Sequence, residues 1–125
     1  MKLTEVLDRP ERWCQHKTYW ANGDGAVQAV CLQGAVAVVV GGLAFGRTPV
    51  HAFTPMMLRR NAALMEQLAA VIVERDPRMA AADADMIVAT WNDQRTTTFA
   101  DVHAVCAETD RRAEIDRQMM LEDAP

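Results

Sequence analysis

The feature that most constrains this chain is the apolar segment at residues 26–42, AVQAVCLQGAVAVVVGG. Its apolar run is shorter than the roughly 20 residues that cross a bilayer, so it predicts a buried core element. Apolar residues recur there at helical spacing, and Gly41-Gly42 forms a natural helix stop. The β-branched run Val38 to Val40 favours a strand instead. The alanine-rich first half decides the prediction in favour of one buried helix over residues 26–42.

Two further helices have clear start signals. Thr54-Pro55 places a capping side chain before proline, and the helix that follows extends to about Glu74. Its predicted apolar stripe consists of Met57, Asn61, Leu64, Leu68, Val71 and Ile72. Thr98, with Asp101 three residues later, predicts the start of the last helix. The short apolar run at residues 86–88 is compatible with a helical turn or a buried strand.

The strongest turn signal is Asn22-Gly23-Asp24-Gly25, because these residues accept positive φ. It favours a small β-hairpin near residues 17–28, of which only the first strand has a β-prone composition. The predicted fold class is therefore mainly α: a compact bundle of three to four helices with this hairpin. We expect a helical globular domain at residues 1–107 and a charged C-terminal helical extension at residues 108–125.

Composition excludes several classes of protein. Half of the 125 residues are apolar and 24% are charged, which is typical of a globular domain. The net charge of -4 argues against nucleic-acid binding, which needs a basic surface. Three cysteines rule out a complete disulfide framework and suit a reducing compartment. The N-terminus lacks the apolar region of a signal peptide, and no segment reaches spanning length. These observations predict a cytoplasmic protein without membrane contact.

Two sequence blocks resemble those of a known family. The first is Gly25 followed by Ala29-Val30-Cys31-Leu32-Gln33-Gly34-Ala35, and the second is Trp91-Asn92-Asp93 followed by a threonine and Asp101-Val102. Together they resemble an uncharacterised domain-of-unknown-function family of small proteins from actinobacteria and their phages, over residues 10–113. The resemblance implies an actinobacterial or phage source and a cytoplasmic setting. It implies no activity, because none is established for the family.

The polar segment Trp91-Asn92-Asp93 is the main candidate binding site. By composition it is a loop, and its Asn and Asp are typical of helix caps and Asx-turns. The functional alternative is a pocket in which Trp91 forms one wall and Asn92 and Asp93 hold a ligand or a partner's backbone. His103 on the last helix completes this candidate site, and Trp20 is a candidate anchor residue if it is exposed.

No catalytic residue, metal ion or cofactor is predicted. Cys31, His103 and Asp93 have the residue types of a nucleophile, a base and an orienting carboxylate. They are not predicted to be catalytic, because Cys31 lies on the buried stripe of the predicted helix. The residues with metal-ligating side chains are Cys14, His16, Cys31, His51, His103 and Cys106. They lack the paired, repeated spacing of known zinc sites.

The favoured function is therefore a small non-enzymatic protein-interaction module, phage-encoded or phage-like, that binds a host protein or itself. The last helix offers Ile115, Met119, Met120 and Leu121 for dimerisation or docking. The alternative is a small hydrolase-type enzyme that uses the Asn92-Asp93 loop with His103 or a cysteine. A third reading is small-ligand sensing in a pocket walled by Trp91.

Overall fold

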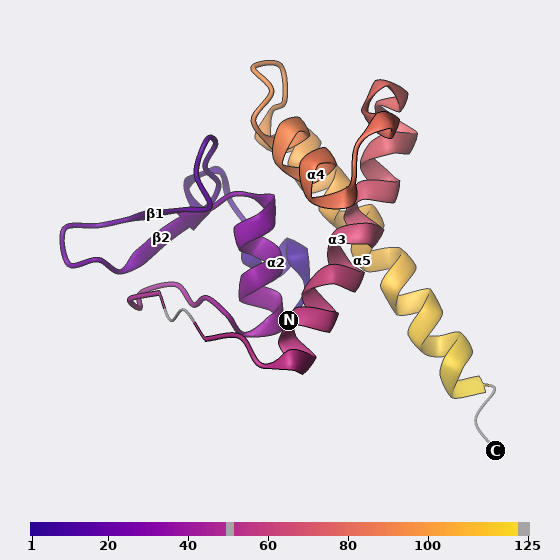
Figure 1. Cartoon of the computed structure of the whole chain (residues 1–125), viewed down its shortest axis with the longest axis horizontal. Coiled ribbons are helices and arrows are strands. Elements are labelled where there is room, and N and C mark those ends of the chain that lie inside the picture. The colour runs from indigo at the N-terminus through magenta and orange to yellow at the C-terminus, as the bar shows by residue number, and fades with distance from the viewer. Residues whose placement is uncertain (50–51, 123–125) are drawn as a thin grey trace.

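The computed structural model describes residues 1–49 and 52–122, in which five α-helices and one two-stranded sheet are present. In chain order the elements are α1 (Leu3–Val6), the 3-10 helix η1 (Pro10–Arg12), β1 (Tyr19–Ala21), β2 (Val27–Val30), α2 (Leu32–Val40), α3 (Pro55–Arg75), the 3-10 helix η2 (Pro77–Ala81), α4 (Ala84–Asn92) and α5 (Phe99–Glu122). The predicted mainly α fold with a small hairpin is confirmed (Figure 1).

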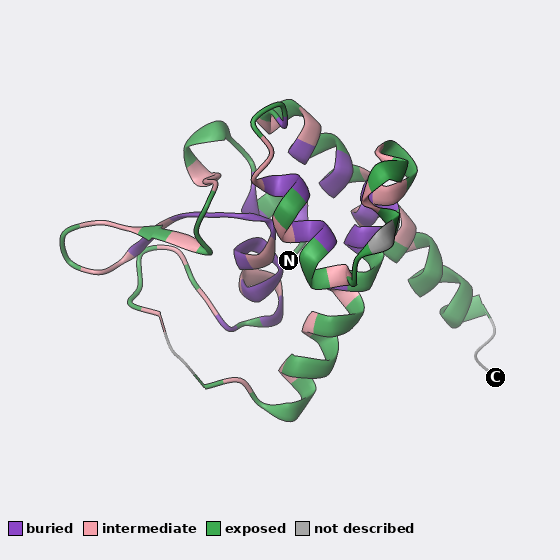
Figure 2. Cartoon of the chain, turned by 45° about the horizontal axis from the view of Figure 1, so that its top comes forward, coloured by how far each residue is buried: buried purple, intermediate pink, exposed green. Residues whose placement is uncertain are grey.

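Helix α3 lies at the centre of the molecule and contacts α2, α4 and α5. The core forms where these helices meet, and Figure 2 shows buried residues there and exposed residues along the outer part of α5. Fully buried side chains come from every helix of the body, including Leu32, Leu68, Ile72, Val88 and Val102. Each helix thus turns one apolar stripe inward, as expected for helices that pack in layers.

The prediction of a single helix over residues 26–42 is wrong for its first half. Residues Val27–Val30 form β2, which runs antiparallel to β1 with Trp20 opposite Ala29. Val30 also pairs in parallel with Trp13, so β2 has backbone partners on both sides. These partners, together with the burial of Val27 and Val30, outweigh alanine's helix propensity, which is worth less than about 1 kcal/mol per residue. The hairpin therefore includes a second strand that composition did not indicate.

The second half of that segment is helical, although Val38 to Val40 favour a strand by composition. Helix α2 buries Val36 and Val40, and this packing overrides the local preference of the β-branched residues. The predicted stop is confirmed: Gly41 caps the helix with a φ of 93°, the left-handed conformation that glycine adopts without strain.

The two other start signals are confirmed in detail. The Thr54 hydroxyl accepts a hydrogen bond from the Met57 backbone N–H at 3.1 Å at the start of α3. At the start of α5, Asp101 accepts from the Thr98 N–H at 2.9 Å, and Thr98 accepts from the Asp101 N–H at 3.2 Å. The ambiguous run at residues 86–88 lies inside α4 and is helical.

Candidate functional site

Trp91 and Asn92 are the last two residues of α4, and Asp93 is the C-cap of that helix. The prediction of a loop at this position is therefore wrong. The helix continues because the Trp91 and Asn92 side chains are both buried, and the Asp93 N–H still donates to the Ala89 carbonyl at 3.1 Å. Trp91 is a core residue with 4% exposure, so it does not form the wall of an open pocket.

Asn92 joins three parts of the chain through its side-chain amide. Its Oδ1 accepts hydrogen bonds from the Trp13 indole N–H at 2.8 Å and from the Leu32 backbone N–H at 3.1 Å. Its Nδ2 donates to the Cys14 carbonyl at 3.2 Å and to Asp93 Oδ1 at 2.9 Å. All four hydrogen-bonding positions of the amide are thus used within the protein. Asn92 therefore binds distant segments of its own chain, at Trp13, Cys14 and Leu32, which differs from the local cap or Asx-turn of the structural interpretation.

Neighbouring contacts hold residues 13–16 against the end of α4. The Asp93 carboxylate accepts from the His16 backbone N–H at 2.8 Å, and Gln15 Nε2 donates to the Asn92 and Gln94 carbonyls at 2.9 and 3.0 Å. His16 has a φ of 68°, a conformation that is uncommon outside glycine. We call residues 13–16, 92 and 93 the Asn92 latch.

A shallow hollow of about 180 Å³ lies beside the latch, and we call it the Cys31 hollow. It is lined by His16, Lys17, Thr18, Cys31, Gln33, Ala89 and Asp93. Cys31 is buried as predicted, but it is the N-cap of α2 and does not lie inside the helix. A helix N-terminus stabilises a thiolate, and the Gly34 N–H donates to Cys31 Sγ at 3.5 Å. Burial is the larger effect and raises the pKa of Cys31, so the thiol is protonated at neutral pH.

The remaining candidate residues lie apart from the Cys31 hollow. His103 is exposed on α5, with its ring centroid 6.0 Å from that of Phe99. Trp20 is 49% exposed on β1 and lines a second hollow with Arg9, Glu11, Arg12 and Gln28. Among the five candidate residues, a side-chain hydrogen bond joins Asn92 to Asp93.

The described residues offer neither a metal-binding cluster nor a membrane-spanning helix. Within residues 1–49 and 52–122, no three His, Cys, Asp or Glu side chains form a group able to hold a metal ion. His51 lies outside the described residues. The helices in the same ranges are too short or too polar to cross a membrane.

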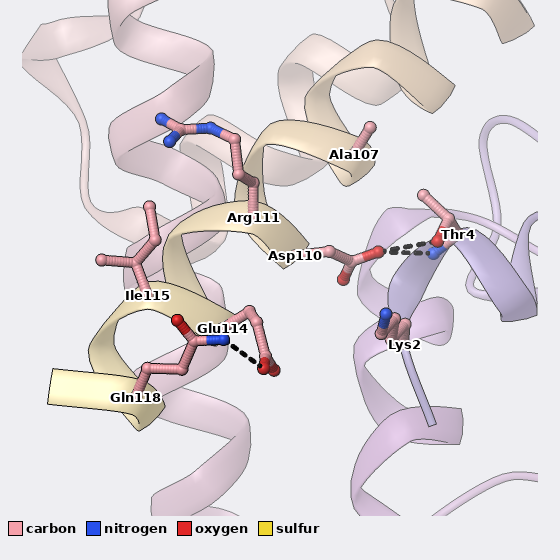
Figure 3. A pocket seen from close by; sticks show the side chains of 8 residues that line it. All are labelled: Lys2, Thr4, Ala107, Asp110, Arg111, Glu114, Ile115 and Gln118. Carbon is pink, nitrogen blue, oxygen red and sulfur yellow. Dashed lines mark hydrogen bonds between the residues drawn. The ribbon is translucent and has the colours of Figure 1, made fainter. Parts of the chain in front are cut away.

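A groove of about 400 Å³ between α1 and α5 was not anticipated from the sequence (Figure 3). Its lining comes from Lys2 and Thr4 on one side and from residues of α5, including Asp110, Arg111, Glu114 and Ile115, on the other. Asp110 closes one side, since its carboxylate accepts from the Leu3 and Thr4 backbone N–H groups, both at 3.0 Å, and from the Thr4 hydroxyl at 2.8 Å. A helix N-terminus needs such acceptors, but their source 106 residues away is not readable from local sequence.

Helix α5 continues beyond this groove and extends away from the body (Figure 1). Its last buried residue is Thr109. Asp110 still accepts hydrogen bonds from α1 and Arg112 pairs with Glu74 of α3, whereas residues 115–122 are all exposed. Four large apolar side chains in this part are exposed, by 41% at Ile115, 57% at Met119, 76% at Met120 and 63% at Leu121. We call residues 110–122 the distal part of α5.

Comparison with known proteins places the chain in a family. No curated protein and no solved structure matches it. Residues 2–112 match the model of a family described as a family of unknown function, DUF6197. The match covers the body and ends near the start of the distal part of α5. It confirms the predicted resemblance to an uncharacterised domain family, and the chain belongs to this family of unknown function, DUF6197.

Proposed function

We propose that this protein is a non-enzymatic interaction module that associates with a second copy of itself through the distal part of α5. The observation that carries the proposal is the exposure of Ile115, Met119, Met120 and Leu121 on one projecting helical segment. Single exposed apolar residues are ordinary, but a cluster marks an interaction surface. Burying one such side chain fully contributes about 1.5–3 kcal/mol, so a few of them can stabilise a dimer.

The charges of α5 support association with an identical surface. Glu108 pairs with Arg111 at 2.6 Å and with Arg112 at 2.9 Å, and Glu114 pairs with Arg117 at 2.6 Å. Hydrogen bonds from the two arginines lower the pKa of Glu108 to about 2, so the carboxylate stays charged near neutrality. Because both signs occur along the helix, two copies can approach without the repulsion of a single-sign surface, and a two-fold contact brings the same patch together.

The test compares two methionines that are equally exposed on different helices. Met119→Glu places a charge in the proposed interface, whereas Met86→Glu places the same charge on α4, where Met86 is 56% exposed. We expect sedimentation to give a dimer for the wild type and for Met86→Glu and a monomer for Met119→Glu. A chain truncated after Ala113 should stay folded and remain monomeric. A wild type that is monomeric at high concentration, or equal effects of both substitutions, would remove the proposal.

The proposal also covers the cellular setting, the origin and the alternative partners of the protein. We place the protein in the cytoplasm, because its three cysteines are free. The resemblance of its sequence blocks supports an actinobacterial or phage-like origin. A host protein is the alternative partner of the distal part of α5, and the net charge of -4 disfavours nucleic acid. Binding of a host protein by the same segment is a separate proposal, which a monomeric wild type would leave to be tested on its own.

One observation favours a second candidate function, hydrolase-type catalysis. Cys31, His16 and Asp93 line the same hollow, and Cys31 lies at a helix N-terminus as nucleophilic cysteines often do. The buried, protonated state of the thiol opposes this function. Iodoacetamide alkylation of the folded protein separates the two readings: rapid reaction at Cys31 favours an enzyme, and protection of Cys31 favours the interaction module.

A further inference from the structure

Cys14 and Cys31 are neighbours across two extended segments. Trp13 pairs with Val30 in parallel, and the Cys14 backbone N–H donates to the Val30 carbonyl at 3.0 Å. Cys14 and Cys31, the residues that follow this pair, are therefore next to each other on two adjacent extended segments of the chain. Neighbouring strands lie about 4.8 Å apart, and a disulfide needs Cα atoms about 4.4–6.8 Å apart. Paired residues also project on the same face, so the backbone arrangement suits a bond between these two sulfurs.

The surroundings of the two thiols agree with this placement. The negative charge of Asp93 acts on both thiols and raises the pKa of each, after the larger effect of burial. A negative charge on Cys31 would also repel the Cys14 thiolate, and together these effects raise the pKa of Cys14 to about 11. Cys31 is 5% exposed beneath its hollow, whereas Cys14 is half-buried and reachable from solvent. Cys14 is thus the thiol that a reagent meets first.

We propose that Cys14 and Cys31 are a covalent modification site at which a low-molecular-weight disulfide, such as oxidised glutathione, forms an intramolecular disulfide. The Cys14 thiolate attacks one sulfur of the reagent, which breaks the reagent's S–S bond and releases one small thiol. The Cys31 thiolate then attacks the Cys14 sulfur and releases the second small thiol. The protein loses two hydrogen atoms and is oxidised by two electrons, and the reagent is reduced to two thiols.

The disulfide joins the Asn92 latch to the start of α2. Cys14 belongs to residues 13–16 of the latch, and Cys31 is the N-cap of α2, so the bond covalently closes the segment that contains the β-hairpin. A cross-link of this kind restricts the unfolded chain and raises the unfolding temperature. Cys106 is fully buried on α5 and takes no part in the reaction.

The experiment treats the folded, reduced protein with oxidised glutathione in a mildly alkaline buffer and follows its intact mass. Blocking remaining thiols with iodoacetamide and mapping the peptides then identifies the linked cysteines. We expect a product that has lost two hydrogen atoms, carries no glutathione, links Cys14 to Cys31 and unfolds at a higher temperature than the reduced protein. Cys106→Ser should give the same product, because its thiol is not involved.

Two variants keep the proposal falsifiable. Cys14→Ser replaces the more accessible thiol and should give no cross-linked product, while circular dichroism checks that it folds. Cys31→Ser should retain glutathione on Cys14, because no second thiol is present to release it. A wild type that keeps a stable glutathione adduct, forms disulfides only between molecules, links either residue to Cys106, or fails to react would overturn the proposal.

Discussion

At the scale of single residues, the buried side-chain amide of Asn92 decides how the N-terminal segment is positioned. Asn92 is 1% exposed and uses its whole amide to connect α4 with residues 13–14 and with the first residue of α2. A buried polar group that is fully hydrogen-bonded stabilises one arrangement of its neighbours, since every alternative leaves unpaired donors. The Asn92 latch therefore positions the N-terminal segment and supplies no free group to a ligand.

Replacement of Asn92 by alanine should be severely destabilising. The substitution leaves the Leu32 N–H and the Trp13 indole N–H without their acceptor, and each unsatisfied buried donor costs about 1–3 kcal/mol. We expect urea denaturation to show a loss of about 3 kcal/mol or more in the free energy of unfolding. Asn61→Ala, at a partly exposed position on α3, is the matched control and should change stability by less than about 1 kcal/mol. Similar losses for both variants would contradict this role of Asn92.

The function of the Trp91-Asn92-Asp93 motif was only partly predictable. The sequence identifies an asparagine and an aspartate beside a large aromatic residue, and it indicates that local capping is the common use of such side chains. The actual partners of Asn92 lie 60 and 79 residues away along the chain, at Leu32 and Trp13. No local pattern encodes contacts at that separation, so the latch and the position of Cys31 beside it required the structure.

At the scale of secondary-structure elements, the packing of α2 against the hairpin depends on the absence of a side chain at Gly34. A Cβ added at Gly34 would lie 2.3 Å from the Thr18 carbonyl oxygen and 2.8 Å from Val30 Cβ, distances that real Cβ atoms do not adopt. Gly34, in the first sequence block, is thus the point at which α2 packs against the Thr18 backbone, just before β1, and against Val30 at the end of β2.

Gly34→Ala should destabilise the protein although alanine is the better helix former. Propensity favours alanine by about 1 kcal/mol, but relief of the clash requires α2 to move from the hairpin, and overpacking of this kind costs about 1–3 kcal/mol or more. We expect a net loss of stability in urea denaturation. Gly23→Ala is the control, because a Cβ there meets no atom within 4 Å. An unchanged or raised unfolding midpoint for Gly34→Ala would show that the contact is adjustable.

Predictability from sequence differed between elements for a physical reason. Helices α3 and α5 were predicted with their caps because the Thr54 and Thr98 hydroxyls accept hydrogen bonds from backbone N–H groups three residues later. The strand at Val27–Val30 was misassigned as helix because it is stabilised by pairing with β1 and with Trp13, partners that its own composition does not reveal. Local signals fix the elements that are stabilised locally, and tertiary partners decide the rest.

At the scale of the whole molecule, ionisable groups divide between the surface and the interior. Arginines lower the pKa of several surface carboxylates, including Glu74, Glu108 and Glu114, and salt screens these surface pairs. The thiols of Cys31 and Cys106 are buried, and their pKa is raised because burial disfavours the charged form. Because these buried thiols ionise only at alkaline pH, the free energy of unfolding should depend on pH in the alkaline range and change little near neutrality.

Burial of Cys106 should make the protein less stable above the ordinary pKa of a thiol. The pKa of Cys106 is raised from 9.0 to about 12, mainly by burial and then by the charge of Asp110. In the unfolded chain the thiol loses its proton near pH 9.0, whereas the folded chain keeps it until about pH 12. The stabilisation is thus complete below pH 9.0 and decreases above it, by about 1.4 kcal/mol per pH unit for each such thiol.

Urea denaturation of the wild type and of Cys106→Ala on both sides of pH 9.0 measures this effect. The cavity left by the smaller side chain lowers the stability of Cys106→Ala by a similar amount at every pH, so the diagnostic quantity is the slope of unfolding free energy against pH. We expect the alkaline slope of Cys106→Ala to be shallower than that of the wild type by about 1.4 kcal/mol per pH unit, with Cys14 and Cys31 causing the slope that remains. Parallel curves would mean that the unfolded and folded chains hold the Cys106 proton equally, and that this thiol is accessible to solvent in the native protein.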